Sequence, residues 1–222
     1  ELMIERMNSD LANILGNLVN RTISMTNKYL GGVLENKNVT EAVDDDLKET
    51  VLSVPKAVEE KMDKLRVADA ITEVFRLFKR CNKYIDETEP WVLGKDEAKK
   101  DRLATVLYNL VEAITIGASL LEAFMPETSD KILSQLQTEK RELSAMDQFG
   151  LYPSGNKVTD KPEILFQRMD LEEVMKKVEE LHPKVEEKKE EEAVIDIEPK
   201  DEITFEQFGA MQFQVGEIIA CE

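Results

Sequence analysis

The sequence predicts an all-α protein whose main part is an antiparallel helix bundle. Two observations carry this prediction: apolar residues recur at steps of three, four and seven over long stretches, and Gly or Pro separates these stretches. With 222 residues and 42% hydrophobic content, the chain can bury one sizeable core. We therefore expect four or five helices that are joined by short turns and pack with alternating direction.

The first predicted helix covers residues 3–30. It ends at Gly31 and Gly32, because Gly accepts the left-handed conformation that follows many helix C-termini. Its apolar stripe consists of Ile4, Met7, Leu11, Leu15, Leu18, Met25 and Tyr29.

Further amphipathic helices are predicted over residues 43–62, 66–88 and 97–124. Pro55 interrupts the helix at 43–62 or begins a new helix at its own position. Pro90 ends the helical pattern after residues 66–88. Pro126 ends the third and begins another helix, which Thr128 or Ser129 is expected to cap.

Changes in residue composition and patterning divide the chain into four parts. Residues 1–146 form the helical domain, and residues 147–181 form an irregular extension with β-prone pieces and a short helix. Residues 182–202 form a charged linker that we expect to be extended. Residues 203–222 alternate apolar and polar side chains, which predicts the first strands of a truncated β domain.

The charge balance limits the classes of partner. The chain has 29 Lys and Arg against 46 Asp and Glu, a net charge of −17, with −5 in residues 183–202 and −9 in residues 1–182. This balance argues against general affinity for DNA, RNA or an anionic membrane but allows a small local site. No apolar run is long enough to predict a membrane span.

The residue types that most enzymes need for catalysis are scarce in this sequence. The single histidine, His182, lies at the edge of the linker, and no His or Cys cluster has metal-ligand spacing. No Gly-rich phosphate loop is present. Cys81 and Cys221 lie far apart and are expected to be free thiols in a reducing cytoplasm. We therefore predict no catalytic residue and no metal site in this chain.

The polar face of the first helix is unusual because it carries amides and a guanidinium instead of carboxylates. Asn17 and Arg21 are four residues apart, so they project from the same face. Arg21 has no acid three or four residues away in the sequence. Both side chains can hydrogen-bond to the edge of a base in a single-stranded loop. The alternative is that Arg21 pairs with an acid of another helix.

Two further features fit an RNA site, each with a simpler alternative. Trp91, the one tryptophan, follows Pro90 and can stack on a base or anchor the core. A basic row on the helix at 66–88 suits phosphates, or is an ordinary solvated face. The row consists of Arg76, Lys79, Arg80 and Lys83.

Taken together, four segments of the chain resemble the C-terminal half of the methionyl-tRNA synthetase family, in the same order. They are NSDLANILGNLVNRTISMTNKYLGGVL, FKRCNKYIDETEPWVLGKDE, LYNLVEAITIGASLLEAFMPETSDKI and LFQRMD. The resemblance implies the bundle of a class I synthetase anticodon-binding domain over residues 1–180. It also implies that Asn17, Arg21 and Trp91 recognise the methionine anticodon. ITFEQFGAMQFQVGEII is similar to the start of the family's C-terminal OB-fold tRNA-binding module.

The resemblance also implies the biochemical setting. The partner is methionine tRNA, the parent protein is an ATP-dependent methionine–tRNA ligase of the cytoplasm, and ATP and methionine bind a catalytic domain that would precede residue 1. Homodimerisation through the complete C-terminal module is a further implication. The alternatives are an anticodon-binding domain of another class I synthetase, such as the leucine, valine or cysteine enzyme, and a helical scaffold that binds proteins.

Overall fold

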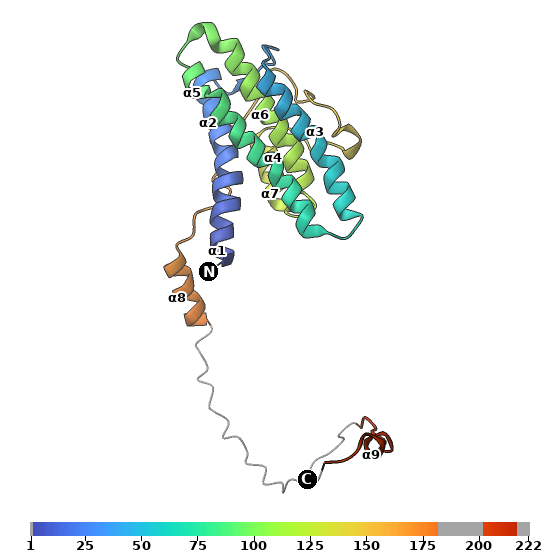
Figure 1. The fold of residues 1–222 in the computed structure, drawn as a ribbon. Coiled ribbons are helices and arrows are strands. Elements are labelled where there is room, and N and C mark those ends of the chain that lie inside the picture. The colour runs from blue at the N-terminus through green and yellow to red at the C-terminus, as the bar shows by residue number, and fades with distance from the viewer. Residues whose placement is uncertain (1, 182–201, 217–222) are drawn as a thin grey trace. The chain divides into compact units, whose positions relative to one another are not determined.

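A long continuous helix, part of which is π-helical, opens the bundle (Figure 1). The computed structural model of the protein describes residues 2–181 and 202–216. The first helix comprises α1 (Leu2–Arg6), the π-helical segment η1 (Met7–Gly16) and α2 (Asn17–Leu30). It ends as predicted, because Gly31 has a φ of 63° and Gly32 a φ of 86°. The predicted all-α class is confirmed.

The π-helical segment changes which residues of the first helix are buried. The Asn17 amide donates to the carbonyl of Ala12, five residues earlier, and the Asn82 side chain of the neighbouring helix donates to the Ile14 carbonyl at 3.0 Å. Such wide turns shift the helical phase. The predicted stripe packs against the core, with Met25 and Tyr29 partly buried, but it leaves out the fully buried Thr22, Ile23 and Thr26.

The two helices that follow form an antiparallel hairpin. They are α3 (Ala42–Met62) and α4 (Val67–Thr88), and Pro55 lies inside α3 without ending it. The short α5 (Pro90–Leu93) begins after Glu89, whose φ is 42°, and the single turn η2 (Glu97–Lys99) leads into α6.

The last two helices of the bundle are α6 (Lys100–Leu121) and α7 (Pro126–Gln135). The predicted cap of α7 is wrong. Met125 occupies the N-cap position and Pro126 begins the helix, so Thr128 and Ser129 lie inside its first turn. The Ser129 hydroxyl instead donates to the Ala118 carbonyl of α6 at 2.7 Å.

Helix α6 is the centre of the core. Every residue from Arg102 to Leu121 is buried, and the helix packs against α2, α3, α4, α5 and α7. Together with η2 it is long and apolar enough to cross a membrane, with a mean hydropathy of 1.5, which the sequence reading overlooked. Its most apolar window is, however, entirely buried inside the bundle, as expected for the core helix of a globular domain.

The irregular extension runs back along the first helix. After the turn η3 (Leu143–Ala145), strand β2 (Asn156–Lys157) pairs antiparallel with β1 (Val33–Leu34), next to the end of α2. The chain then passes Gly16, against which Phe166 packs, and reaches Asn8, whose side chain bonds both backbone groups of Met169 at 2.8 Å. The predicted short helix is confirmed as α8 (Leu171–Leu181).

The C-terminal part differs from its prediction where the structure describes it. Residues 205–209 form a short helix, α9 (Phe205–Gly209), instead of a strand, because Thr204 and Gln207 form a reciprocal capping box. The chain divides into two compact units at Lys176 and Lys177. The predicted linker, residues 182–202, lies outside the described residues except for Glu202, and His182 and Cys221 also lie outside them.

Candidate nucleic-acid interface

Asn17 and Arg21 lie on the solvent side of α2, directly after the π-helical segment. Asn17 is exposed and Arg21 is half-buried. Within the described parts of the chain, neither side chain makes a hydrogen bond or an ion pair, although acids are abundant. The alternative reading of Arg21 as one half of an ion pair across the bundle therefore has no support among the described residues.

The structure brings Trp91 to this face. The left-handed conformation of Glu89 turns the chain sharply, and α5 then packs against α6. The ring of Trp91 is half-buried and rests partly on the core. The Arg21 guanidinium lies over the ring, 5.9 Å from its centroid, within the range of a cation–π contact. Trp91 therefore lies close to the polar face of the first helix.

The close approach of Tyr29 and Gly94 positions the end of α5 against α2; Tyr29 was predicted only as part of the apolar stripe, and no role was predicted for Gly94. A Cβ atom on Gly94 would lie 2.6 Å from two ring carbons of Tyr29, so only glycine fits here. The amino group of Lys28 lies 5.0 Å from the Tyr29 ring centroid. The one available signal was a glycine three residues after Trp91.

The amides of the first helix divide into two groups. Asn8 and Asn27 are structural, because Asn8 binds the backbone of Met169 and Asn27 donates to the Thr159 carbonyl at 2.9 Å. Both hold the extension against the helix. Asn13 and Asn17, by contrast, are exposed, so only part of the amide-rich face is available to a ligand.

The predicted basic row does not remain a free stripe. Arg80 is buried and pairs with Asp46 at 2.7 Å and Glu87 at 3.0 Å, so it is a structural residue and not an accessible phosphate contact. Arg76 pairs with Glu73 and Lys83 with Glu87, but both remain exposed, as does Lys79.

A buried polar network stabilises the end of the bundle that carries α5. The Asp44 carboxylate of α3 accepts hydrogen bonds from Tyr84 of α4 and, at 2.7 and 2.9 Å, from Arg102 of α6. Burial opposes ionisation of Asp44, but the hydrogen bonds from Arg102 and Tyr84 outweigh it, and the pKa of Asp44 lies below its usual value. This network joins three helices into a rigid support.

Arginine, asparagine and tryptophan can recognise a base but supply no nucleophile or general base. The described residues contain no cluster of His, Cys, Asp and Glu side chains that could hold a metal ion. The arrangement therefore fits binding chemistry: a ring for stacking, and amide and guanidinium donors for the edge of a base.

Comparison with known proteins agrees with this geometry. Residues 34–184 match the family model described as the anticodon binding domain of methionyl tRNA ligase. The chain is 45% identical to the methionine–tRNA ligase of Caldanaerobacter subterraneus subsp. tengcongensis and 40% identical to that of Clostridium perfringens. Each alignment covers all of this chain and 34% of the relative.

A solved structure extends the likeness to the fold. The chain is similar to apo methionyl-tRNA synthetase of Mycobacterium tuberculosis, with a TM-score of 0.69 and 32% identity over 75% of this chain and 34% of that one. The chain thus spans about a third of the length of these relatives. Its helical part, with Arg21 and Trp91 together on one face, belongs to the family of methionyl-tRNA ligase anticodon-binding domains.

Proposed function

We propose that this chain reads the anticodon of methionine tRNA as part of an ATP-dependent methionine–tRNA ligase of the cytoplasm. The observation that carries the proposal is the contact of Arg21 with Trp91 beside the exposed Asn17, on a face where the described residues leave Arg21 without an acid. ATP and methionine would bind outside this chain, in the two thirds of the ligase that it does not span.

Recognition divides into stacking and edge reading. A base that is splayed out of the anticodon loop can stack on the Trp91 ring, which presents the edge of that base or its neighbour to Arg21 and Asn17. Carboxylates on this face would repel the phosphates, and lysines would bind phosphates without reading sequence. Amide and guanidinium groups give directional donors and acceptors instead.

The RNA backbone requires a separate set of cations. Our candidates for phosphate contacts are the exposed residues Arg76, Lys79 and Lys83 of α4. Arg80 is buried and is not a candidate. Because the chain carries −17 overall, these contacts act locally and do not give general affinity for RNA. Dimerisation through a complete C-terminal module would be a property of the longer ligase.

The direct test is a binding titration of the chain with two anticodon stem-loops. One carries the methionine anticodon, and the other differs from it by one anticodon base. We expect saturable binding of the first and roughly 10-fold or greater weakening for the second, since one misread base costs about 1–3 kcal/mol. Equal binding of both would contradict anticodon reading, and absence of binding would favour a protein-binding scaffold.

A further inference from the structure

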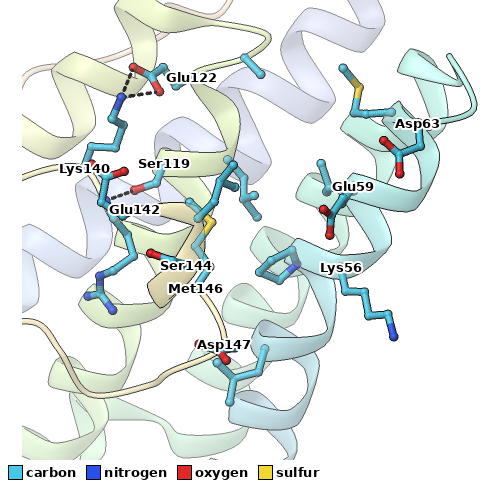
Figure 2. A pocket seen from close by; sticks show the side chains of 18 residues that line it. Lys56, Glu59, Asp63, Ser119, Glu122, Lys140, Glu142, Ser144, Met146 and Asp147 are labelled. Carbon is cyan, nitrogen blue, oxygen red and sulfur yellow. Dashed lines mark hydrogen bonds and ion pairs between the residues drawn. The ribbon is translucent and has the colours of Figure 1, made fainter.

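A groove lies beside the C-terminal end of α6. Its volume is about 1030 Å³. The last part of α3 and the residue after it (residues 52–63) form one wall, residues 140–147 form the other, and residues 119–123 form the floor (Figure 2). This volume is at the upper end for small-molecule pockets, and the groove is elongated along α3.

The interior of the groove is largely apolar. Leu143 is 77% exposed and Met62 is 36% exposed, although both are large apolar side chains at the groove. The other apolar residues of its lining are Leu52, Pro55, Val58, Leu120, Ala123 and Met146. Exposed apolar side chains that line a concave surface mark an interaction site more strongly than the same residues scattered singly.

Both walls of the groove carry negative charge. Glu59 and Asp63 lie on the α3 wall, and Glu142 and Asp147 lie on the opposite wall. All four are exposed, and none of them forms an ion pair with another residue in the described ranges.

The basic residues of the lining do not cancel this charge. Lys140 pairs with Glu122 at 3.0 Å, Arg141 pairs with the buried Glu112 at 2.9 Å, and the amino group of Lys56 points away from the groove (Figure 2). The groove therefore presents an apolar centre between two acidic edges.

This charge pattern excludes two occupants. RNA phosphates would be repelled, and the anticodon face lies near α5, a few residues before the start of α6, whereas the floor of the groove is at the other end of that helix. A helix of this length spans about 30 Å. Residues 183–202 of the chain itself carry a net charge of −5 and would also be repelled.

We propose that this groove binds a basic amphipathic helix of another protein. The wall from Leu52 of α3 to Asp63, the residue after the helix, is about 16 Å long, which matches roughly three helical turns. An apolar stripe at i, i+3, i+4 and i+7 seats between the walls, and Lys or Arg on both flanks of that stripe faces the acids of each wall. Because the groove and the anticodon face are separate, the partner and the tRNA bind together.

The probe is a fluorescent peptide of about 15 residues, long enough to form a helix when bound. It has Leu at i, i+3, i+4 and i+7, Lys on both flanks and Ala elsewhere. We expect saturable binding to the chain that weakens as salt is added, and about 10-fold weaker binding of the same peptide with Glu in place of Lys. Equal binding of the two peptides, or no saturable binding of either, would overturn the proposal.

Charge reversal locates the site. Glu59→Lys combined with Glu142→Lys should weaken the Lys peptide by roughly 10-fold and leave anticodon stem-loop binding unchanged. The matched control is Glu49→Lys, an exposed residue of α3 outside the groove, which should change binding by less than about 2-fold. An equal loss with Glu49→Lys, or displacement of the peptide by the stem-loop, would refute the groove as the site. Binding to the chain but not to the whole ligase would show that the rest of the enzyme covers the groove, and would also overturn the proposal.

Discussion

At the scale of single residues, a substitution of Arg21 tests whether this side chain reads a base or only attracts the RNA backbone. Its guanidinium contacts Trp91 and, in the described chain, no carboxylate. Arg21→Gln should weaken the methionine stem-loop by about 1–3 kcal/mol and reduce its preference over an anticodon variant, because a bidentate donor is lost. Binding titrations of both stem-loops at fixed salt measure this.

The exposed Lys79 supplies the control for Arg21. Lys79→Gln should weaken both stem-loops by the same factor and lower the salt dependence of binding, as expected for a phosphate contact. If Arg21→Gln gave that same pattern, Arg21 would be a phosphate contact. If it changed only the free energy of unfolding, the residue would be structural.

Trp91 combines two roles, because its ring is half-buried against the core and also faces Arg21. Trp91→Ala therefore removes stacking and some packing together, so this variant should lose stability as well as affinity. Trp91→Leu retains an apolar side chain without the ring. We expect it to weaken the stem-loop by about 1–3 kcal/mol with a small change in thermal stability. Wild-type affinity of Trp91→Leu would identify the ring as a core anchor only.

At the scale of elements, the contact of Tyr29 with Gly94 sets the position of α5 on α2. An added Cβ at Gly94 would meet the Tyr29 ring at 2.6 Å, and relief of such overpacking shifts the backbone at a cost of about 1–3 kcal/mol. Gly94→Ala should displace Trp91 and weaken stem-loop binding. Tyr29→Ala in the same chain should restore part of that affinity, since it makes room for the methyl group.

Recovery of stem-loop affinity in the Gly94→Ala, Tyr29→Ala double variant would distinguish a positioning contact from a general loss of stability. A coupling of about 0.5–3 kcal/mol between the two substitutions is expected for residues in contact. Gly209→Ala is the matched control, because an added Cβ there meets no atom within 4 Å, and it should leave binding unchanged. Additive effects of Gly94→Ala and Tyr29→Ala would contradict a shared role.

At the scale of the whole molecule, the Asp44 network links α3, α4 and α6 and makes stability depend on pH. The pKa of Asp44 is lower in the folded chain than its usual value, so its contribution is complete above the unfolded pKa of about 3.9 and is lost as pH falls through the folded value. Urea unfolding at several pH values should show stability declining as the medium becomes acidic.

Asp44→Asn should remove part of that decline. At neutral pH it should also cost up to about 3–5 kcal/mol, because Arg102 loses its buried carboxylate partner and retains only the exposed Glu41, 3.3 Å away. A variant with wild-type stability at neutral pH and the same acid profile would contradict the assigned role of the network.

The sequence by itself determined which segments form the helices of the bundle, and several of the helix ends. Helix α4 covers Val67–Thr88 against a predicted 66–88, and Gly31 ends α2 at the predicted residue. These features are local, since apolar spacing and the conformational limits of Gly and Pro act within a few residues of each other. A common role for Asn17, Arg21 and Trp91 was implied only by the resemblance of their segments to the methionyl-tRNA synthetase family, and the structure places Arg21 beside Trp91.

Only the tertiary structure decided which of several similar side chains are available to a ligand. Arg80 is paired with Asp46, 34 residues away in sequence, whereas Arg21 contacts an aromatic ring. Asn27 donates to the Thr159 carbonyl, 132 residues away, whereas Asn17 stays exposed. The π-helical segment likewise receives a hydrogen bond from Asn82 of another helix, at the Ile14 carbonyl. The physical reason is that a polar side chain takes its role from its hydrogen-bonding partner, and distant parts of the chain supply that partner only after folding.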